Sequence, residues 1–160
     1  MSLSEWYKNG WLKAHETTAQ EIADLLALAA RDLQDCQRAQ GLSDDWRFSI
    51  AYNAALQASC AALAASGYAV PKGDSNHYRV IQSLAFTIGL TPKEIDALDG
   101  YRKKRSMSIY DAAGVISDAE AKRIVPFAAS LVTRISQWLR DEHPELMRST
   151  ESATPKTPRR

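Results

Sequence analysis

The segment from residue 43 to residue 66 constrains the fold of this chain more than any other. Taken as a helix, it carries large apolar side chains on one face and small ones on the opposite face. The large side chains are Phe48, Tyr52, Leu56, Cys60 and Leu63, and the small ones are Ala51, Ala54, Ala55, Ala58, Ala62 and Ala65. Such a helix can be buried on both sides, because small side chains let a second helix approach closely. The segment therefore predicts the central helix of a bundle.

The amino-acid composition also favours a helical fold. Of 160 residues 25 are alanine, against only 7 glycines and 6 prolines. Alanine has the highest helix propensity, whereas sheet proteins need more β-branched residues and turn glycines. Lys plus Arg number 20 and Asp plus Glu 19, which leaves a net charge of +1. A chain so evenly balanced does not coat nucleic acid through its bulk charge, so any electrostatic site must be local.

Start and stop signals divide residues 1–147 into about five main helices. Ser43 is predicted to be the N-cap of the alanine-rich helix, and Gly67 is predicted to end it. The segments TPKE (91–94) and SDAE (117–120) have the pattern of capping boxes and begin two further helices. With short loops between the helices, the pattern predicts an all-α, up-and-down bundle in a single domain.

Further helices are expected before and between these. A short amphipathic helix carrying Trp6, Trp11 and Leu12 precedes a long helix over about residues 16–40. Another helix is expected over about residues 75–88. In each segment the apolar residues recur at three- and four-residue steps, which is the period of one helix face.

The C-terminal third contains two more features that shape the expected fold. The helix that begins at residue 91 is expected to run to about residue 113. Pro126 lies inside the last helix and is predicted to kink it, because proline removes one backbone donor. Residues 148–160 have no apolar periodicity and are predicted to form a disordered basic tail.

No motif for metal, redox or cofactor chemistry is recognisable. Cys36 and Cys60 lack the spacing of a zinc or redox site and are predicted to be buried free thiols. No histidines or carboxylates have metal-ligand spacing, and no glycine-rich nucleotide motif is present, so neither a metal nor a cofactor is expected. The longest apolar stretch, residues 58–65, is far shorter than the roughly 20 residues that span a membrane. Without a signal-peptide pattern, the expected location is the cytosol.

The most informative stretch for function is YRKKRSMSIYD, residues 101–111. Its basic and hydroxyl-bearing candidates are Arg102, Lys103, Lys104, Arg105, Ser106 and Tyr110. Arg102, Ser106 and Tyr110 are spaced by four residues, which places them on one helix face, and Arg105 lies beside them. Guanidinium groups bind phosphate oxygens, and a tyrosine ring offers a base a surface for stacking. A solvated helix face is the alternative interpretation of this charge run.

The arrangement of Arg105 and Tyr110 resembles the motif of the HEPN family. These are small all-helical bundles of prokaryotic toxin–antitoxin, defence and nucleotidyltransferase-associated proteins. Their signature is an arginine, usually followed by a polar residue, with a histidine or tyrosine a few positions later in a late helix. The segment GDSNHYRVIQSL, with His77, also resembles the opening of the family's third helix. The resemblance covers about residues 45–140.

The resemblance implies a homodimer in which the motif residues of two subunits meet in a cleft that binds RNA. Many members of the family cut RNA there without a metal, with the histidine moving a proton and the arginine holding the scissile phosphate. In this chain Tyr110 stands in place of that histidine. An unperturbed tyrosine titrates near pH ~10, against about 6.5 for histidine, so Tyr110 is a poor base at neutral pH.

Binding of RNA or nucleotide phosphate is therefore expected in preference to cleavage. The expected binding residues are Arg102, Lys103, Lys104, Ser106 and His77, and the catalytic pair of a metal-independent endoribonuclease would be Arg105 and Tyr110. Two other interpretations stay open. The chain could be a non-catalytic partner subunit that binds a nucleotide or a nucleotidyltransferase, or a structural dimer whose motif forms an interhelical polar network. His77 could also serve only as a cap at the start of its helix.

Overall fold

The computed structural model describes residues 1–73, 76–110 and 113–148, and the side chains of all of these except residues 109 and 110. The protein is 72% helix, with seven helices and one pair of two-residue strands in the described part of the chain. The prediction of an all-α fold is confirmed. The predicted C-terminal tail lies outside the described residues, except for Arg148.

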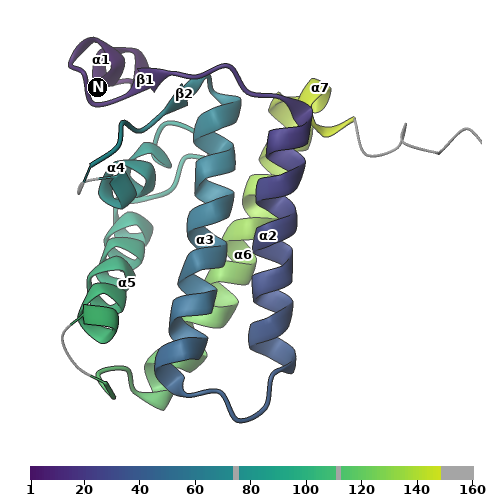
Figure 1. Cartoon of the computed structure of the whole chain (residues 1–160). Helices are drawn as coiled ribbons and strands as arrows, with labels where there is room; N and C mark the ends of the chain where they lie inside the picture. Colours follow the sequence, from purple (N-terminus) through teal and green to yellow (C-terminus); the bar gives the residue numbers. More distant parts are fainter. Residues whose placement is uncertain (74–75, 111–112, 149–160) are drawn as a thin grey trace, which may run out of the picture.

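Three long helices pack side by side to form the core: α2 (Ala19–Arg38), α3 (Asp44–Ala65) and α6 (Asp118–Glu142) (Figure 1). Helix α3 is the central one, and it is buried on both its large-residue and its alanine face. Ala51, Ala54, Ala55, Ala58, Ala61 and Ala62 are all fully buried. The close approach that small side chains allow is therefore what lets α3 bury both faces, as the sequence predicts.

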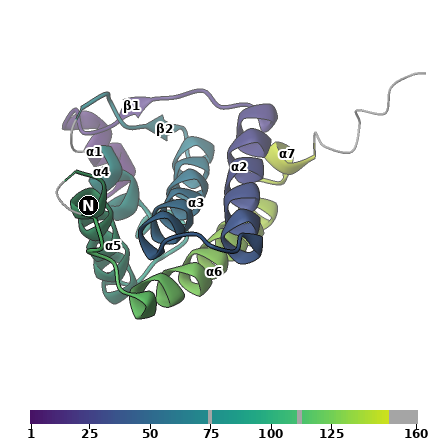
Figure 2. The same ribbon diagram turned by 60° about the horizontal axis from the view of Figure 1, so that its bottom comes forward.

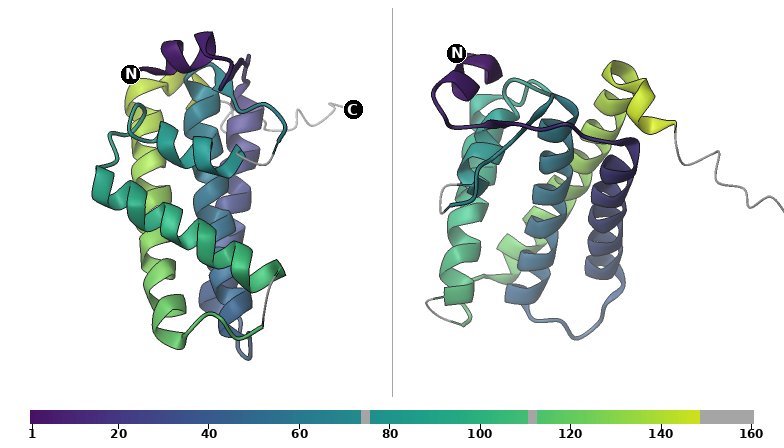
Figure 3. Two further views of the ribbon diagram at one scale, coloured as in Figure 1. Left: turned by 90° about the vertical axis from the view of Figure 1, so that its left-hand side faces the viewer. Right: turned by 45° about the horizontal axis from the view of Figure 1, so that its top comes forward.

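A second layer covers the side of α3 that faces away from α2 (Figure 2). It consists of α4 (Asn76–Ser83) and α5 (Pro92–Tyr110), and α5 crosses obliquely over α3 and α6 (Figure 3). The ring of Tyr101 joins this layer to the core, because it lies edge-on to Phe48 of α3 at 5.7 Å and to Phe127 of α6 at 5.3 Å. Arg134 of α6 also donates to Glu94 at the start of α5. Helix α5 of this layer carries the basic residues 102–105.

Four short elements close one end of the bundle, shown at the top of Figure 1: α1 (Leu3–Lys8), β1 (Lys13–Ala14), β2 (Tyr68–Ala69) and α7 (Pro144–Met147). Strand β1 pairs antiparallel with β2, with Lys13 opposite Ala69. Residues 68–69 are expected to lie in a loop, but they form a short strand that pairs with the N-terminal segment.

The expectation that Trp11 and Leu12 belong to the first helix is wrong. Helix α1 ends at Lys8, and Gly10 adopts a φ of 76°, a left-handed conformation that only glycine takes without strain. The chain reverses there, so Trp11 and Leu12 lie in the connection to β1. Leu12 is nevertheless buried, at 2% exposure.

The three helix starts predicted from capping residues agree with the structure. The Ser43 hydroxyl accepts a hydrogen bond from the backbone N–H of Trp46 at 3.2 Å. The two capping boxes are also present, since the Thr91 and Ser117 hydroxyls accept from the N–H groups of Glu94 and Glu120. Caps of this kind satisfy orphan donors locally, which is why short sequence patterns identify them.

Two helix boundaries differ from expectation. Helix α2 begins at Ala19, capped by Thr18, rather than at residue 16. Helix α4 ends at Ser83 rather than near residue 88, because the following segment winds into tighter turns with hydrogen bonds between residues three apart. Helix α5 is described as far as residue 110, and its expected continuation over 111–112 lies outside the described residues. Pro126 lies inside helix α6, as the sequence indicates.

Helix α3 is long and apolar enough to cross a membrane by length and composition. In its most apolar window, 72% is buried inside the protein. The core helix of a soluble protein passes the same test, so this burial is consistent with a soluble protein.

Candidate functional site

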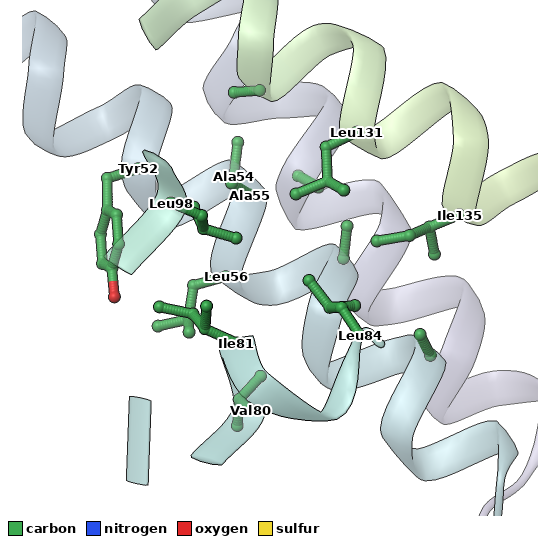
Figure 4. Close-up of a cluster of buried hydrophobic side chains, with 14 of the residues drawn as sticks. Tyr52, Ala54, Ala55, Leu56, Val80, Ile81, Leu84, Leu98, Leu131 and Ile135 are labelled. Atoms are coloured by element: carbon green, nitrogen blue, oxygen red, sulfur yellow. The ribbon is translucent and has the colours of Figure 1, made fainter. Parts of the chain in front are cut away.

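Side chains from three helices meet beside the basic stretch. Tyr52 of α3 has its hydroxyl oxygen 3.3 Å from Nδ1 of His77 at the start of α4. The guanidinium carbon of Arg105 on α5 lies 5.3 Å from the centre of the Tyr52 ring. Figure 4 shows Tyr52 at the edge of the buried apolar cluster, with its hydroxyl turned away from Leu131 and Ile135. We refer to Tyr52, His77, Arg105 and the adjacent Arg102 as the arginine cluster.

Arg102 is held in place by an acidic neighbour on its own helix. Its Nε donates to an oxygen of Asp99 at 2.7 Å, and Lys103 approaches the other oxygen at 3.5 Å. The side chain of Asp99 is mostly buried, at 13% exposure. The single negative charge of Asp99 faces the two positive charges of Arg102 and Lys103, so it neutralises only one of them.

Arg105 differs from Arg102 in its surroundings. Its Nε is buried and has no hydrogen-bond partner in the described part of the chain. A buried donor without a partner costs free energy, more so when it is charged. An anionic acceptor would remove this cost if the surrounding side chains shift to let it reach the Nε.

Burial and the two guanidinium groups shape the protonation of the cluster. Burial, followed by the charges of Arg105 and Arg102, holds the pKa of His77 below its usual value of 6.5. Burial raises the pKa of Tyr52, and this outweighs the lowering effect of Arg105. At neutral pH the imidazole is therefore neutral and Tyr52 keeps its proton. The Tyr52 hydroxyl can donate to Nδ1 of His77, which leaves the imidazole proton on Nε2.

An NMR titration of the imidazole signals is expected to give His77 a pKa below 6.5, because burial and two nearby cations disfavour its charged form. Substitution Arg105→Gln is expected to raise that pKa only part of the way, since burial is the larger cause. A His77 pKa at or above 6.5 in the wild-type protein would contradict the described surroundings of the ring.

The structure separates the predicted site residues into two groups. His77, Arg102 and Arg105 come together in the arginine cluster. Lys104 instead pairs with Glu120 of α6 at 3.2 Å, whereas Lys103 and Ser106 are exposed to solvent. The side chain of Tyr110, predicted to be half of a catalytic pair, lies outside the described residues.

Sequence reasoning did not include Tyr52 in the site. The apolar pattern predicts Tyr52 on the large-residue face of α3, and the residue is fully buried there. The signal that could have indicated a second role is its hydroxyl, because a buried tyrosine usually places that group against a polar partner.

A groove of about 780 Å³ lies between the start of α3 and the loop that precedes α6. Its lining includes the exposed Trp46 together with Asp44 and Asp45, and no basic residue lines it in the described part of the chain. Asp45 accepts hydrogen bonds from the backbone N–H groups of Gly114 and Ile116, at 2.7 and 3.2 Å. The two carboxylates would repel a phosphate, so this groove is a poor site for nucleic acid.

The cysteines and the acidic residues offer no alternative chemistry in the described residues. Cys36 and Cys60 are free thiols, and burial raises the pKa of each to about 11. A thiol with so high a pKa is a weak nucleophile at neutral pH. No group of three or more His, Cys, Asp or Glu side chains within residues 1–73, 76–108 and 113–148 could hold a metal ion.

Comparisons with protein-family models, with curated proteins and with solved structures find no match to this chain. The resemblance to the HEPN family therefore rests on the motif residues themselves. The function of the chain is therefore inferred from the geometry of the arginine cluster.

Proposed function

We propose that this chain binds RNA at the arginine cluster, whose side chains contact the phosphate groups of the RNA. The observation that carries the proposal is the buried Nε of Arg105, which has no hydrogen-bond partner in the described residues. In line with the HEPN resemblance, the protein acts as a cytoplasmic homodimer in a toxin–antitoxin or defence system, with two arginine clusters in one cleft.

The chemistry of the cluster suits a phosphodiester. A guanidinium group presents several N–H donors in one plane and can bind two phosphate oxygens at once. Asp99 orients Arg102, and the Tyr52 ring lies against Arg105, so both cations are positioned before a ligand arrives. The Nε2–H of a neutral His77 would add a third donor. An RNA phosphate supplies the negative charge and the acceptor atoms that these donors match.

Binding is proposed as the activity, rather than cleavage. Metal-free cleavage needs a base for the ribose 2′-hydroxyl and an acid for the leaving oxygen. Tyr52 has a raised pKa and cannot act as a base at neutral pH. Burial and the two guanidinium groups lower the pKa of His77, and donation from Tyr52 to Nδ1 would leave Nε2 carrying a proton rather than free to accept one.

The test is the affinity of a fluorescein-labelled single-stranded RNA, measured by anisotropy over a range of salt concentrations. Substitution Arg105→Gln is expected to weaken binding by about tenfold to a hundredfold, the range for one lost charge-assisted hydrogen-bond contact. The slope of log affinity against log salt concentration should become shallower by about 0.7 for each phosphate contact removed.

Lys122→Gln is the matched control. This substitution also removes one positive charge, but the Lys122 side chain is 73% exposed, and its one salt bridge among the described residues is to Asp118 one turn away, at 2.8 Å. Its affinity and salt slope should stay close to those of the wild-type protein. Equal losses in the two variants would show that only net charge matters and would contradict a site at Arg105.

Melting temperatures of the same variants separate binding from a structural polar network. Because the Arg105 Nε has no partner in the described residues, Arg105→Gln should leave the ligand-free protein about as stable as before. A large loss of stability with unchanged RNA affinity would instead support the structural network.

A further inference from the structure

The arginine cluster continues along α4 as an alternating row of cations and aromatic rings. The guanidinium carbon of Arg102 lies 5.7 Å from the centre of the Tyr78 ring. The guanidinium carbon of Arg79 lies 5.8 Å from the same ring and 4.1 Å from the Trp11 ring. We call Arg102, Tyr78, Arg79 and Trp11 the aromatic row.

Tyr78 is the accessible member of this row. Tyr78 is 39% exposed, although two cations flank its ring. In the described part of the chain its hydroxyl makes no hydrogen bond, and the residues next to it on α4 are His77 and Arg79. The ring is therefore available to a ligand beside the His77 edge of the arginine cluster.

Arg79 is positioned by stacking rather than by an acidic partner. It lies over Trp11, and also 5.5 Å from the Trp6 ring, which in turn contacts Phe86 edge-on at 5.2 Å. In the described residues Arg79 forms no salt bridge. A cation held in one place by aromatic rings, with no carboxylate against it, is a second contact for an anion.

We propose that Tyr78 is a base-stacking subsite and Arg79 a second phosphate contact, so that the site selects single-stranded RNA over duplex RNA. This inference rests on the proposed function, because it extends the same strand from the arginine cluster along α4. The base of one nucleotide stacks on Tyr78 while the phosphates on either side lie against Arg102 and Arg79. A base within a duplex is already stacked and paired, so it cannot cover the Tyr78 ring without leaving the helix.

The experiment compares Tyr78→Leu and Tyr78→Phe, using a short single-stranded RNA with 2-aminopurine in its centre and the corresponding duplex. Loss of one base–aromatic stack is expected to weaken single-strand binding by Tyr78→Leu about tenfold or more. Tyr78→Phe keeps the ring and should bind like the wild type. Stacking should quench the 2-aminopurine fluorescence with the wild type and with Tyr78→Phe, and not with Tyr78→Leu.

Tyr7→Leu is the control for the removal of an exposed tyrosine. Tyr7 is 48% exposed on α1 and contacts Tyr68 at 6.0 Å, outside the aromatic row. Its affinity and quenching should match the wild type. The proposal is overturned if Tyr78→Leu keeps full affinity and quenching, or if duplex RNA binds as tightly as the single strand. In either case a loss of affinity in Arg105→Gln would still uphold the proposed function, whereas wild-type protein that binds no RNA would refute both.

Discussion

Replacing Phe48 by alanine is expected to lower the free energy of unfolding by about 3–5 kcal/mol, the usual cost of deleting a fully buried aromatic ring. Phe48 has no exposed surface. It also lies edge-on to Tyr101, which lies edge-on to Phe127. Aromatic pairs of this geometry add about 0.5–1.5 kcal/mol beyond the area they bury. The change therefore removes core volume and loosens the attachment of α5 to α3.

Urea unfolding followed by circular dichroism measures this effect, with Phe86→Ala as the matched control. Phe86 is 39% exposed and loses much less buried surface, so its cost should be less than half that of Phe48→Ala. Because Tyr101 precedes Arg102 on α5, Phe48→Ala should also weaken RNA binding at temperatures where the variant remains folded. Equal costs at the two positions would show that Phe48 does not anchor the α4–α5 layer.

The second large effect is expected from Ala58→Leu, which should lower the free energy of unfolding by about 1–3 kcal/mol. Ala58 is fully buried on the alanine face of α3, and a leucine there adds volume that a close-packed core cannot accept without displacing a neighbouring helix. The reason is steric, since leucine is nearly as good a helix former as alanine.

Ala30→Leu on α2 tests that reason, because the same substitution there falls on an exposed position. Its effect should stay within about 0.5 kcal/mol. A leucine tolerated equally well at both positions would mean that the alanine face of α3 is not closely packed. Close approach of a neighbouring helix would then not explain why α3 is buried on both faces.

Much of the fold follows from the sequence because its signals are local. The caps at Ser43, Thr91 and Ser117 each depend on a hydroxyl and a backbone N–H three residues apart. The double burial of α3 follows from the two apolar faces of a single segment. The apolar pattern of the first helix continues through Trp11 and Leu12, but the helix itself ends at Lys8 because the chain reverses at Gly10.

Less of the candidate site than of the fold could be predicted from the sequence. Spacing of three residues places Arg102 and Arg105 on one side of α5, and the same rule could have placed Lys104 on the other side, where it pairs with Glu120. Tyr52 could not be assigned to the site in this way, because its partners His77 and Arg105 belong to two other helices.

The sequence by itself determined that the fold is helical, where the helices with capping residues at Ser43, Thr91 and Ser117 begin, and that α3 is central, because propensity, capping and face polarity act within a few residues. Only the tertiary structure decided that Tyr52 and His77, which are 25 residues apart, meet beside Arg105 of a third helix. The packing of α4 and α5 onto α3 makes that contact. It depends on the combined fit of many side chains from distant segments, which no local pattern encodes.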